Sequence, residues 1–173
     1  MANSSYGPLS LIGLLVNDKP GVMMKITGMF ARRGFNIASI TVGHSEKPGV
    51  SRITIGAEGD EDTIEQIIKQ LNKLIDVIKV QHLRPENTAV RECALVKIAY
   101  KDHSNLQEIT TIIDLYKAKA IDVSDQFIII EIVGSPNKVS SFINVIEEIA
   151  PIKELVRSGL LGIIKGKSTL NLD

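Results

Sequence analysis

The sequence predicts an α+β protein made of two copies of one unit, whose elements follow the order strand, helix, strand, strand, helix, strand. Three observations lead to this prediction. Short runs rich in Ile, Val and Leu alternate with segments in which apolar residues recur at helical spacing. This alternation occurs twice along 173 residues, which suffice for two small domains. A polar stretch that contains Pro85, residues 84–93, separates the two copies.

The first copy opens with a continuous apolar run at 9–16 (LSLIGLLV), which is too short for a buried helix and typical of a central strand. One helix is expected to follow Gly21, and another to follow Asp60, whose side chain can cap it. The predicted buried face of the first helix consists of Val22, Ile26, Met29 and Phe30. The other strands are predicted at 37–42, 50–57 and 77–83.

The second copy repeats this order. Ser104 and Gln107 have the spacing of a capping box at the start of one helix, and Ser135-Pro136 is expected to start the other. Each copy is therefore expected to be a ferredoxin-like module, an antiparallel sheet with both helices on one face. The open sheet faces and the edge strands then need a cover, which favours a homo-oligomer. The strands of this copy are predicted at 94–99, 120–123, 127–133 and 152–156.

The composition argues against several classes of function. Twenty basic residues balance twenty acidic ones, and the strands at 9–16 and 50–57 carry no aromatic side chain for base stacking, so nucleic-acid binding is not expected. The chain has no phosphate-binding Gly-rich loop or metal-spaced His pattern, and Cys93 is its only cysteine, which predicts a chain without a catalytic centre. No apolar run approaches the roughly 20 residues of a membrane span, and residues 1–8 lack a signal-peptide pattern. We therefore expect a cytoplasmic protein with no membrane contact.

The two ends of the first predicted helix carry residues that suggest a binding site. The peptide N–H groups of Gly21, Val22 and Met23 lie at the positive end of the helix dipole, where they can receive a carboxylate. Asp18 can receive an ammonium group, and Asn36 carries both a donor and acceptors. Together these residues predict a site for a free amino acid. The same residues also fit a purely structural interpretation, a Pro-Gly loop followed later by a turn-favouring Asn.

The stretch NDKPGVMMKITGMFARRGFNIASITV, followed by SRITI and DEDTIEQIIKQLNKLIDVIKV, resembles the ACT domain of acetolactate synthase small subunits. ECALVKI, AIDVS and LVRSG in the second half resemble the carboxy-terminal domain of the same family. The resemblance runs through the chain in one order, and it implies the following domains: an ACT domain at 9–83, a linker at 84–93, a carboxy-terminal ferredoxin-like domain at 94–165 and a tail at 166–173.

The resemblance implies a chain with no cofactor of its own, which binds and activates a large catalytic subunit that carries thiamine diphosphate, magnesium and FAD. It also implies feedback inhibition by valine, or alternatively by leucine or isoleucine. The family's effector pocket lies between two ACT domains, which implies a homodimer and a site formed by Asp18, Gly21 and Asn36 with Ile37 beside them. Asp18 departs from the Asn that is commonest in the family. A free-standing amino-acid sensor that acts on a different enzyme or transcription factor is the alternative.

Overall fold

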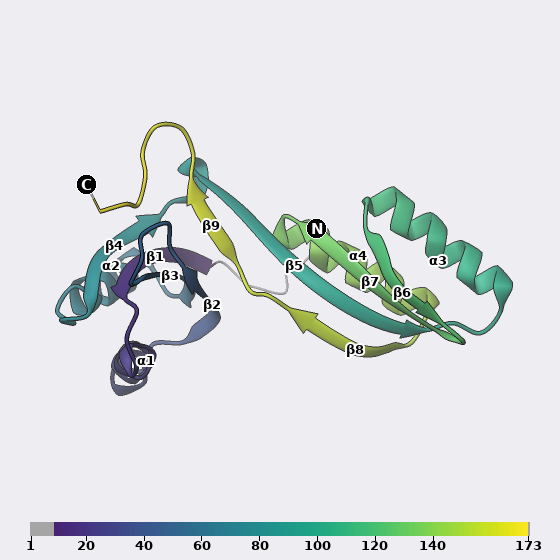
Figure 1. Cartoon of the computed structure of the whole chain (residues 1–173), viewed down its shortest axis with the longest axis horizontal. Helices are drawn as coiled ribbons and strands as arrows, with labels where there is room; N and C mark the ends of the chain where they lie inside the picture. Colours follow the sequence, from purple (N-terminus) through teal and green to yellow (C-terminus); the bar gives the residue numbers. More distant parts are fainter. Residues whose placement is uncertain (1–8, 173) are drawn as a thin grey trace. The chain divides into compact units, whose positions relative to one another are not determined.

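The computed structural model describes residues 9–172 and confirms the predicted fold class, with two antiparallel sheets (Figure 1). Residues 1–8, on which the signal-peptide expectation depends, and residue 173 lie outside the described residues. The first half contains β1 (Leu9–Asn17), α1 (Val22–Arg33), β2 (Ile37–His44), β3 (Val50–Glu58), α2 (Glu61–Leu71) and β4 (Val77–Leu83). The second half contains the 3-10 turn η1 (Pro85–Asn87), β5 (Thr88–Ala99), α3 (His103–Tyr116), β6 (Lys119–Ser124), β7 (Phe127–Gly134), α4 (Pro136–Ile149), β8 (Ile152–Arg157) and β9 (Leu161–Ile164).

The described chain divides into two compact units. We call residues 9–90 with 160–172 the N-terminal module, and residues 91–159 the C-terminal module. Residues 160–172 pack with the N-terminal module, so the predicted second domain at 94–165 and the predicted tail at 166–173 differ from the observed division. We call residues 160–172 the C-terminal segment, and Figure 1 draws it in yellow.

The sheet of the N-terminal module has the strand order β2-β3-β1-β4, and each neighbouring pair is antiparallel. The central strand β1 is buried along residues 11–16, as its unbroken apolar run predicts. Ile12, Leu14 and Val16 pack toward the helices together with alternate residues of β3. The predicted buried face of α1 belongs to the same core, with Val22, Ile26, Met29 and Phe30 all buried.

The other face of this sheet is covered by the C-terminal segment, not by a helix. Leu11 packs with Leu160, and Leu15 packs with Leu170. Gly13 lies between them on the same face, and a Cβ atom there would come within 2.9 Å of Leu170 Cδ2. The glycine inside this strand therefore allows the segment to approach closely. From the sequence, a second copy of the chain is expected to cover this face. For the part of the sheet that the C-terminal segment covers, no second copy is needed.

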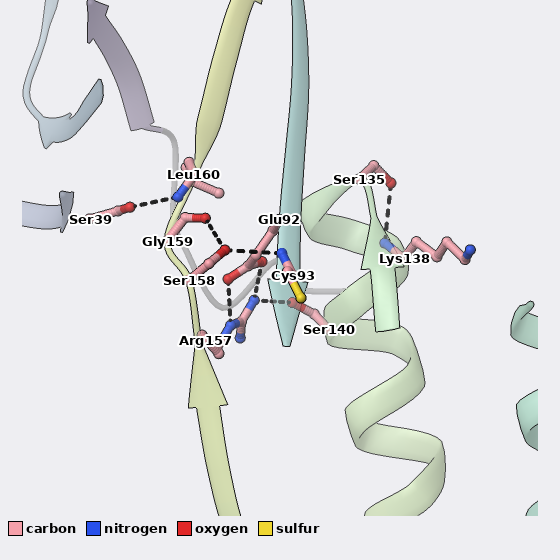
Figure 2. Close-up of polar contacts among 10 residues, drawn as sticks. All are labelled: Ser39, Glu92, Cys93, Ser135, Lys138, Ser140, Arg157, Ser158, Gly159 and Leu160. Carbon is pink, nitrogen blue, oxygen red and sulfur yellow. Dashed lines mark hydrogen bonds and ion pairs between the residues drawn. The ribbon is translucent and has the colours of Figure 1, made fainter. Parts of the chain in front are cut away.

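Hydrogen bonds hold the C-terminal segment on the sheet. Ser39 Oγ accepts the Leu160 N–H at 2.9 Å, and Thr41 Oγ1 donates to the Leu160 carbonyl at 3.2 Å (Figure 2 shows the Ser39 contact). Both backbone polar groups of one buried residue, Leu160, are thus bound by side chains of β2, which satisfies them away from water. Cationic side chains donate to carbonyls further along: Arg52 to Gly162 (3.0 Å) and Leu170 (3.4 Å), Lys79 to Asn171 (3.0 Å), and Lys47 to Leu172 (3.2 Å).

In the C-terminal module, strands β6-β7-β5-β8 form the sheet, and α3 and α4 contribute to its core. The predicted start of α4 is confirmed, because Ser135 Oγ accepts the Lys138 N–H at 3.3 Å (Figure 2). The capping box predicted at Ser104 is wrong. Asp102 caps α3 instead and accepts the Asn105 N–H at 2.9 Å, because its carboxylate is a strong acceptor in the extended conformation that precedes the helix.

Strand β5 begins at Thr88, so much of the stretch expected to be a linker at 84–93 is strand. One charged residue of this stretch, Glu92, has a structural role inside the strand. Glu92 is fully buried in β5, and both of its carboxylate oxygens accept hydrogen bonds from Arg157 of β8 at 2.7 Å (Figure 2). The Arg157 guanidinium also donates to Ser140 of α4 at 3.3 Å. The bidentate contact compensates the buried charge of Glu92, and the partner that supplies it lies 65 residues later in the chain.

We predict that Glu92→Ala lowers the free energy of unfolding by about 3–5 kcal/mol, because it leaves the partly buried guanidinium of Arg157 without its carboxylate. Glu154→Ala is the matched control, since Glu154 is an exposed carboxylate on β8 and its removal should change stability by no more than about 0.5 kcal/mol. Urea unfolding followed by circular dichroism measures both. Equal urea midpoints for the two variants would contradict the prediction.

Candidate functional site

The loop from β1 to α1 presents backbone N–H groups at the start of the helix. Gly21 is the N-cap of α1, with φ +85°, and no side chain caps this end. The Val22 N–H has no partner within the helix, but it donates to the Lys19 carbonyl in the loop at 3.4 Å. The N–H groups of Gly21 and Met23 make no backbone hydrogen bond within residues 9–172. These two groups are the ones left for an anion at the positive end of the helix.

Asp18 is exposed in the same loop, and it has a neighbour that its sequence position does not reveal. His44 Nδ1 lies 3.2 Å from Asp18 Oδ2. The two residues meet because Asp18 follows β1 and His44 ends β2, and both strands flank the start of β3. An ammonium group that binds Asp18 would therefore share this carboxylate with the imidazole. Strand pairing brings the two residues together, and their separation in the sequence does not reveal this contact.

Asn36 and Ile37 lie at the opposite end of the sheet from this loop. Asn17, at the end of β1, pairs with Val50 at the start of β3, whereas Ile37 pairs with Ala57 near the end of β3. Asn36 is exposed and immediately precedes β2, which begins at Ile37.

Helix α1 connects the two ends and has 12 residues, which corresponds to a length of about 18 Å. The ammonium and carboxylate groups of a free amino acid sit on one carbon atom. One chain therefore does not bring Gly21 and Asn36 to the same small ligand. The predicted site residues therefore lie in two separate groups on each chain, one at each end of α1.

The apolar members of the predicted site differ in how far a ligand can reach them. Val22 is buried in the core of the N-terminal module and supports the loop from within. Met23 and Ile37 are half-buried, and they pack against that core while keeping part of their surface exposed. Among the predicted site residues, Met23 offers apolar surface near the N-terminal end of α1 and Ile37 offers it near the C-terminal end.

No helix in the described part of the chain is long and apolar enough to cross a membrane. No group of three or more His, Cys, Asp or Glu side chains in residues 9–172 is arranged to hold a metal ion.

Two protein-family models match this chain in tandem. A model described as the ACT domain of AHAS small subunits matches residues 12–79. A model described as the small subunit of acetolactate synthase matches residues 91–166.

Individual relatives match over almost their full length. The probable acetolactate synthase small subunit of Methanothermobacter thermautotrophicus is 43% identical over 160 residues, which cover 92% of this chain and 95% of that protein. The acetolactate synthase small subunit of Bacillus subtilis is 41% identical over 158 residues and 90% of each chain. The crystal structure of the acetolactate synthase small subunit from Thermotoga maritima superposes with a TM-score of 0.86 and 44% identity, covering 92% of this chain and 99% of that one.

Cys93 has the environment of a structural thiol. It is half-buried, and burial together with the nearby carboxylates of Glu131 and Glu92 raises the pKa of its thiol above the usual value. Since the thiolate is the nucleophile, a raised pKa makes this thiol less reactive at neutral pH.

We predict that iodoacetamide alkylates Cys93 more slowly in the folded chain than in the urea-unfolded chain at neutral pH. The rate in the folded chain should also rise at higher pH than in the unfolded chain, because its thiol loses the proton later. Mass spectrometry over a time course measures both rates. Faster alkylation of the folded chain would show that Cys93 is activated after all.

Proposed function

We propose a regulatory role for this chain, which belongs to the family of acetolactate synthase small subunits. In this proposal the chain has no catalytic centre of its own, binds the large catalytic subunit and raises its turnover. It also makes the complex sensitive to feedback inhibition by valine, or alternatively by leucine or isoleucine. Thiamine diphosphate, magnesium and FAD are expected in the large subunit, not in this chain.

The observation that carries the proposal is the match of both family models, in order, over nearly the whole chain. The ACT model alone would support an amino-acid sensor with an unspecified target. The second model covers the C-terminal module, which a free-standing ACT sensor does not need. The two together favour a subunit that combines sensing with attachment to acetolactate synthase.

We place the effector between the N-terminal modules of two chains. A two-fold axis that sets the α1 helices side by side and antiparallel brings the N-terminal end of one helix next to the C-terminal end of the other. The N–H groups at Gly21 and Met23 of one chain would then bind the effector carboxylate. Asn36 and Ile37 of the other chain would supply hydrogen bonds and an apolar surface, and the pair would hold two equivalent sites.

Copurification and reconstitution test the proposed role. The tagged chain should capture a thiamine-dependent large subunit from its native cells, and adding the purified chain to that subunit should increase turnover of pyruvate. The isolated chain should show no turnover. If no large subunit copurifies and its activity is unchanged by the chain, the free-standing sensor becomes the better interpretation.

We predict that Gly21→Asp abolishes feedback inhibition while activation remains. A carboxylate about 4 Å from the effector carboxylate repels it by about 1 kcal/mol in water, and by several-fold more in a partly buried site. Allosteric coupling is typically about 1–3 kcal/mol, so this repulsion is large enough to remove it. A Cβ atom at Gly21 would meet no atom within 4 Å, and Asp tolerates positive φ better than most residues.

Gly21→Asn is the matched control, because Asn has nearly the same shape and the same tolerance of positive φ but carries no charge. It should retain more inhibition than Gly21→Asp. The measurement is the activity of the reconstituted enzyme against valine, leucine and isoleucine concentration. Inhibition of Gly21→Asp at the parent's effector concentration would place the effector site elsewhere.

A further inference from the structure

A cavity of about 420 Å³ lies within the N-terminal module, between the β2–β3 hairpin and the C-terminal segment. Its volume falls within the range of roughly 300–1,000 Å³ that is usual for small-molecule sites. Glu46 and Arg52 come from the hairpin, and Ile163, Ser168 and Leu170 come from the C-terminal segment. None of the residues predicted for the effector site lines this cavity.

Arg52 supplies the cavity with a cation whose charge is only partly compensated. Its guanidinium donates to two neutral carbonyls, those of Gly162 and Leu170, and forms no ion pair with a carboxylate in residues 9–172. A guanidinium has five N–H donors in a planar fork, so donors remain for a bidentate anion. Burial lowers the pKa of Arg52, opposed in part by the charge of Glu46, as expected for a cation with incomplete solvation.

The remaining walls complement this cation. Glu46 places a negative charge close enough to influence Arg52, but not in contact with it. The side chains of Ile163 and Leu170 provide apolar surface, and the hydroxyl of Ser168 provides a hydrogen-bonding group. A guanidinium that forms no ion pair within residues 9–172, a separate carboxylate and apolar walls suit a small molecule with a carboxylate at one end and an aliphatic body.

We propose that this cavity binds a small aliphatic carboxylate, with the carboxylate group on Arg52 and the aliphatic body against Ile163 and Leu170. The site is separate from the effector site proposed above. Two kinds of molecule share this chemistry, a 2-amino acid and the corresponding 2-oxo acid. Only the amino acid carries an ammonium group that Glu46 can bind, so the effect of removing the Glu46 charge distinguishes the two kinds of ligand.

The test measures binding to the full-length chain by isothermal titration calorimetry, with L-valine and with the 2-oxo acid of the same carbon skeleton as probes. All chains in this test carry Gly21→Asp, so that binding at the proposed effector site does not contribute to the measured affinity. Arg52→Gln in this background should weaken binding about tenfold or more, because it removes a charged hydrogen-bonding partner. Ser168→Trp should also weaken binding, because it fills the cavity while leaving both Arg52 hydrogen bonds in place.

Lys47→Gln is the matched control. Lys47 also holds the C-terminal segment through a carbonyl, that of Leu172, and its loss changes the charge equally, but it does not line the cavity. It should leave the affinity unchanged. If Glu46→Gln weakens the binding of valine but not that of the oxo acid, the proposal is supported with an amino acid as the ligand. If the oxo acid binds and Glu46→Gln leaves its affinity unchanged, the proposal is supported with the oxo acid as the ligand.

The proposal is overturned if neither probe binds the Gly21→Asp chain at millimolar concentration. It is also overturned if Lys47→Gln weakens binding as much as Arg52→Gln, since the effect would then come from attachment of the C-terminal segment. These outcomes do not bear on the regulatory role, because that role is judged from inhibition of the reconstituted enzyme.

Discussion

The N-terminal module depends on the burial of both faces of strand β1. Its residues Ile12, Leu14 and Val16 need the helices, and Leu11 and Leu15 need a second cover on the other face. A sheet strand buried on both sides cannot leave one face to water without losing roughly 1.5–3 kcal/mol for each large apolar side chain exposed. The C-terminal segment supplies this second cover, although it follows the C-terminal module in the chain. Its position there also encloses the cavity beside Arg52.

The first cover of β1 determines the geometry of the candidate effector site. Helix α1 buries four apolar residues against the sheet, so its axis and its two ends are fixed in relation to the strands. The N-terminal end presents the N–H groups of Gly21 and Met23, and the C-terminal end presents Asn36. The length of the helix keeps these groups apart within one chain. A site that uses both ends consequently needs two chains, which links effector binding to dimer geometry.

Local patterns predict much of this molecule. The buried face of α1, the double-sided burial of β1 and the capped start of α4 all follow from periodicity, run length and a Ser-Pro pair. The sequence could not show that Glu92 is a strand residue, because the arginine that compensates its charge lies 65 positions away. Nor could it show that the C-terminal segment covers β1, since that contact joins residues far apart in the chain. The glycine at position 13 was the available signal, because a glycine inside an apolar strand often marks a close approach.

The same division holds for the candidate site. The sequence identifies the loop and the Asn36 turn as polar features at helix ends, but their separation across the sheet depends on strand register, which is a tertiary property. The contact between Asp18 and His44 is of the same kind.

Mixed dimers test the shared effector site most directly. In the proposed dimer, Gly21→Asp damages the part of each site that one chain supplies and Asn36→Ala damages the part that the other chain supplies, so each variant alone carries two defective sites. A dimer with one chain of each kind retains one site made of an unchanged Gly21 and an unchanged Asn36. Unfolding the two variants together and refolding them should therefore restore part of the valine binding and part of the inhibition of the reconstituted enzyme. A refolded mixture that binds valine no better than the two variants kept apart would contradict a site shared between chains.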